Sequence, residues 1–124
     1  MRTAITSPNA SSVGPYSHAI DARGTVFLSG QTPLDSATGR LIDGTIGERT
    51  QKCFNNLFEV LAAGGLTETN VVKVNVFLTK MSDFSAMNEV YKTQFSEPFP
   101  ARSTVAVAEL PLGSDIEIEL IAQR

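Results

Sequence analysis

Two segments near the C-terminus decide the fold of this chain: Phe99-Pro-Ala-Arg-Ser-Thr-Val-Ala-Val107 and Ile116-Glu-Ile-Glu-Leu-Ile121. The first contains β-branched residues that favour a strand, and the second alternates apolar with acidic residues, as a half-buried strand does. Strands over residues 102–107 and 115–122 are therefore predicted, with a Pro/Gly turn between them. This arrangement places Arg102 at the start of one strand, and Glu117 and Glu119 on one face of the other.

The bulk composition predicts one globular domain over residues 1–124. The chain is 42% hydrophobic with a net charge of −3, which argues against disorder, and it has no run of Lys or Arg typical of nucleic-acid binding. The single cysteine, Cys53, is expected to be a buried structural thiol in a reducing compartment. We expect a cytoplasmic protein, or a mitochondrial one if a transit peptide has been removed, with no membrane span. One histidine and no Cys-x-x-Cys motif predict no metal.

The rest of the chain predicts two helices and further strands around them. Apolar residues at helical spacing predict helices over residues 46–63, ended by Gly64-Gly65, and over residues 83–95. Strands are predicted over residues 16–21, 25–29 and 71–79, with a hairpin turn at 22–24, and loops over the N-terminal residues and over 32–45, where residues 39–43 include a short edge strand. In the strand over 71–79, the residues expected to share one face are Val72, Val74, Val76 and Leu78.

The order β-β-α-β-α-β-β predicts an α+β fold, with a mixed, largely antiparallel sheet and two helices packed on one face. The other sheet face mixes polar residues with Val and Phe. Such a face is typical of an interface between copies of a chain.

Arg102 and the two glutamates are the leading candidates for chemistry. A guanidinium matches a carboxylate ligand, and a glutamate activates water or shuttles a proton. Together they suit hydrolysis of a small carboxylate-bearing electrophile, with either Glu117 or Glu119 as the acid–base group. The alternative is an Arg–Glu salt bridge between neighbouring strands, which spacing alone favours.

Three further positions allow two interpretations each. Tyr16, beside Gly14-Pro15, either lines a cleft or packs on the core as an ordinary loop aromatic. Gly30 either lets a ligand approach the backbone or marks a bulge or strand end. Asn88 falls within an apolar helical stripe, where an unsatisfied amide costs about 1–3 kcal/mol, so it is either a core hydrogen-bonder or part of a polar pocket.

Four motifs resemble the reactive-intermediate deaminase family (RidA, formerly YjgF). They are Gly14-Pro-Tyr-Ser, Phe27-Leu-Ser-Gly-Gln31, Val72-Lys-Val-Asn-Val-Phe-Leu78, and Pro100-Ala-Arg-Ser-x-Val with Ile116-Glu-Ile-Glu119. The resemblance covers essentially the whole chain, and the last pair is the family's signature.

The resemblance implies a chorismate-mutase-like fold and a homotrimer with three clefts between subunits. It implies hydrolysis of 2-imino acids, such as 2-iminobutanoate and 2-iminopropanoate, to 2-oxo acids and ammonia. These imines are products of PLP-dependent threonine or serine dehydratases, and the family's reaction needs no metal or organic cofactor.

The resemblance also implies a role for particular residues. Arg102 matches the family arginine that binds the substrate carboxylate, and Glu117 matches the glutamate thought to position and activate the attacking water. The other matching positions are the pocket residues Tyr16 and Ser29, the backbone N–H of Gly30, the interface amide Asn88, and Thr104. Many members have Cys where this chain has Thr104, which bears on substrate preference more than on activity.

Two other functions stay open at this point. The first is a non-catalytic binder or regulator of small carboxylates that uses the same cleft. The second is a translation inhibitor or endoribonuclease, an activity attributed to some relatives, although the acidic balance argues against nucleic acid as a partner.

Overall fold

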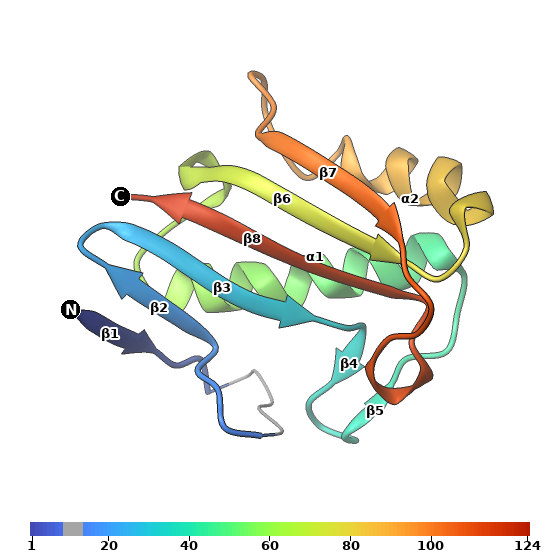
Figure 1. The fold of residues 1–124 in the computed structure, drawn as a ribbon, viewed down its shortest axis with the longest axis horizontal. Coiled ribbons are helices and arrows are strands. Elements are labelled where there is room, and N and C mark those ends of the chain that lie inside the picture. The colour runs from blue at the N-terminus through green and yellow to red at the C-terminus, as the bar shows by residue number, and fades with distance from the viewer. Residues whose placement is uncertain (9–13) are drawn as a thin grey trace.

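The computed structural model describes residues 1–8 and 14–124, and shows one six-stranded sheet with two helices behind it in the view of Figure 1. The strands are β1 (Arg2–Ile5), β2 (Ala19–Ala22), β3 (Thr25–Gln31), β4 (Leu34–Asp35), β5 (Arg40–Leu41), β6 (Val71–Leu78), β7 (Ala101–Ala106) and β8 (Ile116–Gln123). The helices are α1 (Ile46–Ala63) and α2 (Phe84–Tyr91), with short 3₁₀ turns at Glu68–Asn70, Met81–Asp83 and Pro111–Gly113.

The strand order in the large sheet is β1-β2-β3-β8-β6-β7. Among the described strands only β6 and β7 run parallel, because α2 connects them as a crossover, and every other described pair is antiparallel. Strands β4 and β5 form a separate two-stranded sheet. The predicted α+β fold, with a largely antiparallel sheet and both helices on one face, is therefore confirmed.

Helix α1 covers the centre of the sheet and begins and ends as its sequence dictates. The Thr45 hydroxyl accepts from the Glu48 N–H, and the Glu48 carboxylate accepts from the Thr45 N–H, which forms a capping box. At the other end Gly65 adopts φ 73° and Leu66 donates its N–H to the Leu61 carbonyl, so the two glycines end the helix as predicted. The buried stripe of α1 includes Cys53, as expected, and burial raises the pKa of its thiol.

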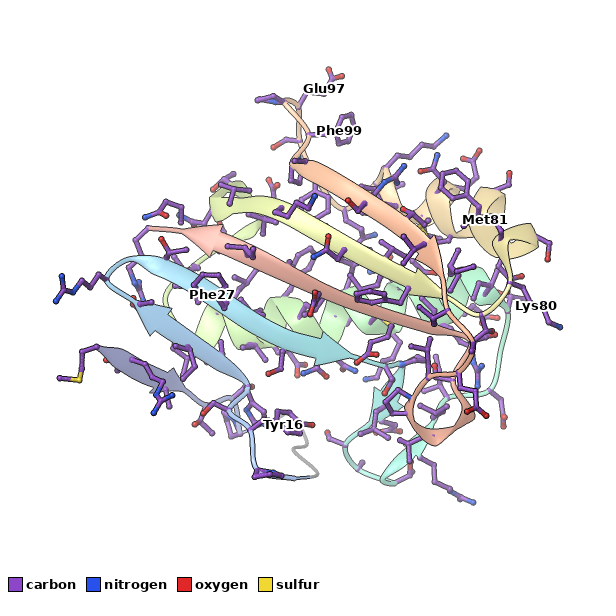
Figure 2. The ribbon with its side chains drawn as sticks, viewed as in Figure 1. Tyr16, Phe27, Lys80, Met81, Glu97 and Phe99 are labelled. Atoms are coloured by element: carbon purple, nitrogen blue, oxygen red, sulfur yellow. The ribbon has the colours of Figure 1, made fainter. Side chains whose placement is uncertain are left out.

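The core lies between the helices and one sheet face. Ile116, Ile118 and Leu120 of β8 are each at most 1% exposed, so the acidic residues between them point to the opposite face. We call the sheet face without helices the open face. Phe27, 47% exposed on β3, projects from it (Figure 2).

One prediction about β6 was wrong at the start of the strand. Val71 is buried, and Val72 is 48% exposed, because a bulge shifts the pairing with β8 between Val71 and Lys73. From Val74 onward the predicted alternation holds, with Val74, Val76 and Leu78 fully buried.

The N-terminal region and the end of the second helix also differ from prediction. Residues 2–5 form the edge strand β1 instead of a loop, and β2 starts at Ala19, so Tyr16 precedes it. Three of the four residues of β1 are exposed, so no apolar alternation marks it; it forms by pairing with β2. Helix α2 ends at Tyr91, although Phe95 beyond it stays buried. Part of the predicted N-terminal loop, residues 9–13, lies outside the described residues.

Candidate active site

Glu117 and the pocket residues predicted around it line one cleft of about 560 Å³. The cleft lies where β3 and β8 meet the loop that precedes β8. Its predicted members are Tyr16, Ser29, Gly30 and Glu117, and its other lining residues are Gln31, Thr32, Leu34, Pro111, Leu112 and Glu119. Tyr16 comes from the loop before β2 and is 44% exposed (Figure 2). We call this the Glu117 cleft.

A β-bulge shapes the floor of the Glu117 cleft. Leu28 pairs with Leu120 and Gln31 pairs with Ile118, so Ser29 and Gly30 together lie opposite Glu119 alone. The Ser29 N–H donates to the His18 carbonyl at 2.9 Å, and its hydroxyl donates to the Ser17 carbonyl at 2.7 Å. These bonds fix the bulge against the segment that carries Tyr16.

The side chain of Glu117 occupies the space that a Cβ at position 30 would fill. A Cβ at position 30 would lie 2.9 Å from Glu117 Cδ and even closer to its carboxylate oxygen. Such distances essentially never occur for real Cβ atoms, so any larger residue would displace the carboxylate. Of the two interpretations of Gly30, the structure confirms the bulge, and the group that lies close to Gly30 is the Glu117 side chain.

The surroundings of Glu117 weaken its acidity. Partial burial raises the pKa of its carboxyl group, and the neighbouring Glu119 carboxylate raises that pKa further. The Asn75 amide donates to Glu119 Oε1 at 3.2 Å, which holds Glu119 against β6. A carboxylate with a raised pKa is a stronger base, which suits abstraction of a proton from water.

Arg102 lines a second cleft, of about 400 Å³, together with Asn88, Tyr91, Lys92, Phe99 and Pro100. Its Nη1 donates to Asn88 Oδ1 at 2.7 Å, and its Cζ lies 4.5 Å from the Tyr91 ring centroid and 5.4 Å from that of Phe84. Asn88 is therefore part of a polar pocket, with Arg102 as its partner. Two aromatic rings and one amide of α2 hold the guanidinium in place, and the sequence patterns did not assign this role to Phe84 or Tyr91.

Arg102 and Glu117 do not meet within one chain. Arg102 pairs with Val74, which is buried under the helices, and its side chain contacts α2. Glu117 pairs with Phe77 and lies between two fully buried residues of β8, so it points to the open face. A salt bridge between neighbouring strands is thus excluded: β6 separates β7 from β8, and the two side chains leave opposite faces of the sheet.

Thr104 lies on the same side of β7 as Arg102, since it pairs with the buried Val76. Its hydroxyl is buried and has no hydrogen-bond partner among the described residues. It does not line the Glu117 cleft or the cleft of Arg102. Across residues 1–8 and 14–124, no group of three or more His, Cys, Asp or Glu side chains is placed so that it could hold a metal ion.

Comparison with known proteins places the chain in a family. A family model described as Endoribonuclease L-PSP matches residues 6–124. The human protein named 2-iminobutanoate/2-iminopropanoate deaminase is 41% identical over 121 residues, covering 98% of this chain and 88% of its own. The fission-yeast protein named mmf1, mitochondrial, is 49% identical over 124 residues, covering 98% of this chain and 75% of its own.

Solved structures agree with the sequence matches. RidA from a Psychrobacter species superposes with a TM-score of 0.94 at 40% identity, over 99% of this chain and 100% of its own. TdcF of E. coli, solved with bound serine, gives a TM-score of 0.92 at 36% identity, over 98% of both chains. The chain belongs to the endoribonuclease L-PSP family, which is also called the RidA/YjgF family. No helix within the described parts of the chain is long and apolar enough to cross a membrane.

Proposed function

We propose that this protein hydrolyses 2-imino acids to 2-oxo acids and ammonia, in a site completed between two copies of the chain. The observation that carries the proposal is the placement of two side chains: one chain presents Glu117, whose pKa is raised, on its open face and Arg102 on its other face. Relatives of 41–46% identity named 2-iminobutanoate/2-iminopropanoate deaminase support the reaction class.

Assembly of several copies is the simplest way to bring the two half-sites together. The open face carries exposed apolar residues, among them Phe27 and Val105, and such surfaces are typical of subunit interfaces. If the β7 edge of one copy lies against the open face of the next, Arg102 of the first approaches Glu117 of the second. Head-to-tail contacts form a closed ring where the rotation between copies closes, and a homotrimer with three equivalent clefts is the assembly we propose.

In this assembly Arg102 binds the substrate carboxylate through its planar fork, with Nη1 already held by Asn88. Glu117 takes a proton from a water molecule, and the water oxygen adds to the imine carbon of the protonated C=N group. The resulting carbinolamine carries the former imine nitrogen as an amine. Glu117 then returns its proton to that nitrogen, the C–N bond breaks, ammonia leaves, and loss of the hydroxyl proton forms the ketone.

The test couples a PLP-dependent threonine dehydratase, which we propose as a source of the substrate, to the purified protein. Residual imine is trapped as its semicarbazone. We expect wild type to lower the trapped fraction and Arg102→Ala to lose the effect, whereas Arg40→Ala removes the same charge from an exposed position and should behave as wild type. Equal performance of wild type and Arg102→Ala would exclude the proposal.

The same protein preparations test the alternative function, in which the protein binds small carboxylates without catalysis. The relative TdcF of E. coli was solved with bound serine, which is a small carboxylate-bearing molecule. NMR titration with 2-oxobutanoate or serine, showing saturation in a protein without imine turnover, would favour this alternative.

Endoribonuclease activity is the second candidate, because the matching family model carries that description. The Glu117 cleft does not favour it: its described lining residues include two glutamates and no Lys or Arg, and phosphate binding depends on cations. RNA cleavage that copurifies with the protein through repeated chromatography and persists in Glu117→Ala would support a separate nuclease site.

A further inference from the structure

The turn before β8 holds a leucine in a conformation that leucine avoids. Leu112 has φ 61° and ψ 16°, in the left-handed region, and Gly113 after it has φ 70°. Glycine and asparagine adopt this region readily, but the Cβ of leucine approaches the backbone too closely there. A bulky residue at such a position calls for a reason.

Burial of the Leu112 side chain within the folded chain does not explain a leucine in this conformation. Leu112 is 63% exposed, so little of its apolar surface is removed from water within the chain. The conformation is instead imposed by the turn around it. The Gly113 N–H donates to the Leu110 carbonyl at 3.2 Å, and the Ser114 N–H donates to the Pro111 carbonyl at 3.1 Å. Ser114 is buried and its hydroxyl donates to the Ile116 carbonyl at 2.7 Å, which anchors the turn to β8.

The strained leucine faces the Glu117 cleft. The residues of this cleft divide by chemistry: Ser29, Gln31, Glu117 and Glu119 of β3 and β8 form a polar floor, whereas β4 and the surrounding loops supply an apolar rim. The rim residues are Tyr16, Leu34, Pro111 and Leu112. A cleft of this kind fits a ligand with a polar reacting centre and a short apolar substituent.

We infer that Leu112 is a specificity-determining residue, which contacts the aliphatic side chain of the substrate and favours longer unbranched chains. The inference rests on the proposed function for the identity of the substrate. The imine carbon lies at Glu117, the carboxylate extends toward Arg102 of the adjacent copy, and the side chain extends along the rim. Strain at residue 112 is kept because it presents the leucine to the cleft.

The experiment measures binding of the 2-oxo acid products with three, four, five and six carbons to the assembled protein by titration calorimetry. In wild type, each added methylene should tighten Kd by about fourfold, which corresponds to about 0.8 kcal/mol per buried methylene. Leu112→Asn should reduce that dependence to less than about twofold per methylene, since its side chain is polar and short. Leu112→Met, which keeps an apolar side chain, should retain most of the dependence.

Two controls make the result decisive. Met81→Asn changes an exposed apolar residue that does not line the cleft, and should keep the wild-type chain-length dependence. Leu112→Asn should unfold at the same or a higher temperature than wild type, because asparagine tolerates the left-handed region, so a loss of selectivity cannot be attributed to misfolding.

The outcomes separate the inference from the proposed function. Chain-length dependence that Leu112→Asn leaves intact, or no dependence in wild type, overturns the inference even if imines are hydrolysed. Dependence that is lost in Leu112→Asn supports it, and does so even if the dehydratase assay shows no imine turnover, in which case the proposed function alone fails.

Discussion

Arg102 and Glu117 leave opposite faces of the same sheet, and strand β6 lies between the two strands that carry them. Arg102 lies against α2 on the helical face, and Glu117 lies on the open face beside Gly30. No rotamer change can bring the two groups to one small ligand within a chain. The site we propose therefore requires a second copy, and the first prediction tests that requirement directly.

Two inactive variants should restore activity to one another. Arg102→Ala and Glu117→Ala each lack one half of every cleft, but a mixed trimer contains one cleft with Arg102 from one variant and Glu117 from the other. Equal mixing with free subunit exchange should recover about a quarter of wild-type activity, since about three-quarters of trimers are mixed and each then has one intact cleft of three.

The control mixes Arg102→Ala with the double variant Arg102→Ala/Glu117→Ala after the same exchange step, which should recover nothing. Subunit exchange is verified independently by mass spectrometry of the intact assemblies. Full exchange without recovered activity would mean that both residues serve the same cleft from one chain, contrary to their placement on opposite faces.

Gly30→Ala should abolish most of the activity with little loss of assembly. The added Cβ would lie 2.9 Å from Glu117 Cδ, so the carboxylate must move away from its position in the cleft. A displacement on this scale typically costs about 10²-fold in rate, which steady-state kinetics measures.

Gly47→Ala is a matched control for this change. Its Cβ would lie 3.5 Å from Val90 Cγ2, an ordinary contact, and it replaces a glycine within α1. We expect unchanged kinetics and about 0.5 kcal/mol of added stability in urea unfolding. Gly30→Ala with kcat within twofold of wild type would show that the position of Glu117 is not critical.

The pH dependence of hydrolysis should report the raised pKa of Glu117. Its base form increases as the pH rises through that pKa, so kcat/KM should increase along an acidic limb. Glu119→Gln removes the like charge that raises the pKa of Glu117, and should move this limb to lower pH. As a control, Glu59→Gln removes the same charge from the exposed side of α1 and should leave the acidic limb in place. An acidic limb that does not move in Glu119→Gln would contradict the effect of the Glu119 charge on the pKa of Glu117.

The same pKa shift predicts an effect on stability. Because burial raises the pKa of Glu117 above its unfolded value, the folded state binds the proton more tightly, and stability falls as the pH rises through that range. Glu117→Gln should therefore be more stable than wild type at pH 7, and the difference should disappear below about pH 4, near the pKa of an unfolded glutamate. Urea unfolding at both pH values measures it. A variant less stable than wild type at pH 7 would reverse the expected sign.

Asn88→Ala should weaken substrate binding more than it slows turnover. Asn88 Oδ1 accepts from Arg102 Nη1 at 2.7 Å and orients the guanidinium for the substrate carboxylate. A hydrogen bond to a charged group contributes about 1.5–3 kcal/mol, so KM should rise by about 10- to 150-fold with a smaller change in kcat. Asn55→Ala on the exposed side of α1 serves as the control, and should leave both constants unchanged. An unchanged KM in Asn88→Ala would remove Asn88 from the binding site.

The parts of the fold that follow from local pattern were predictable. Helix α1 has its capping residues, its apolar stripe and its terminal glycines in sequence, and β8 alternates without interruption. Strand β1 was missed because it is an edge strand with mostly exposed residues, and its extended form depends on its pairing with β2. Val71 is buried and Val72 exposed, contrary to prediction, because of a bulge. The bulge depends on the pairing with the partner strand, so the sequence of consecutive valines does not indicate it.

The candidate site was likewise predictable from the sequence only in part. The sequence placed Glu117 and Arg102 on correct strands, and its resemblance to a family selected them from other charged residues. It could not show that they face opposite sides, because this depends on β7 pairing in parallel beside β6 rather than beside β8. Leu112 was overlooked since a leucine within a Pro/Gly turn gives no signal until its backbone angles are known.

Because the proposed site is divided between two sheet faces, its activity depends on the concentration of the chain. In the assembly we propose, a chain at low abundance can be fully folded and still have no complete cleft, because each cleft would need a neighbour. Where the proposed trimers are largely dissociated into monomers, the active fraction falls roughly with the square of chain concentration. A modest drop in expression would then lower imine clearance out of proportion, and a variant that folds well but assembles poorly would be indistinguishable in the cell from a catalytic defect.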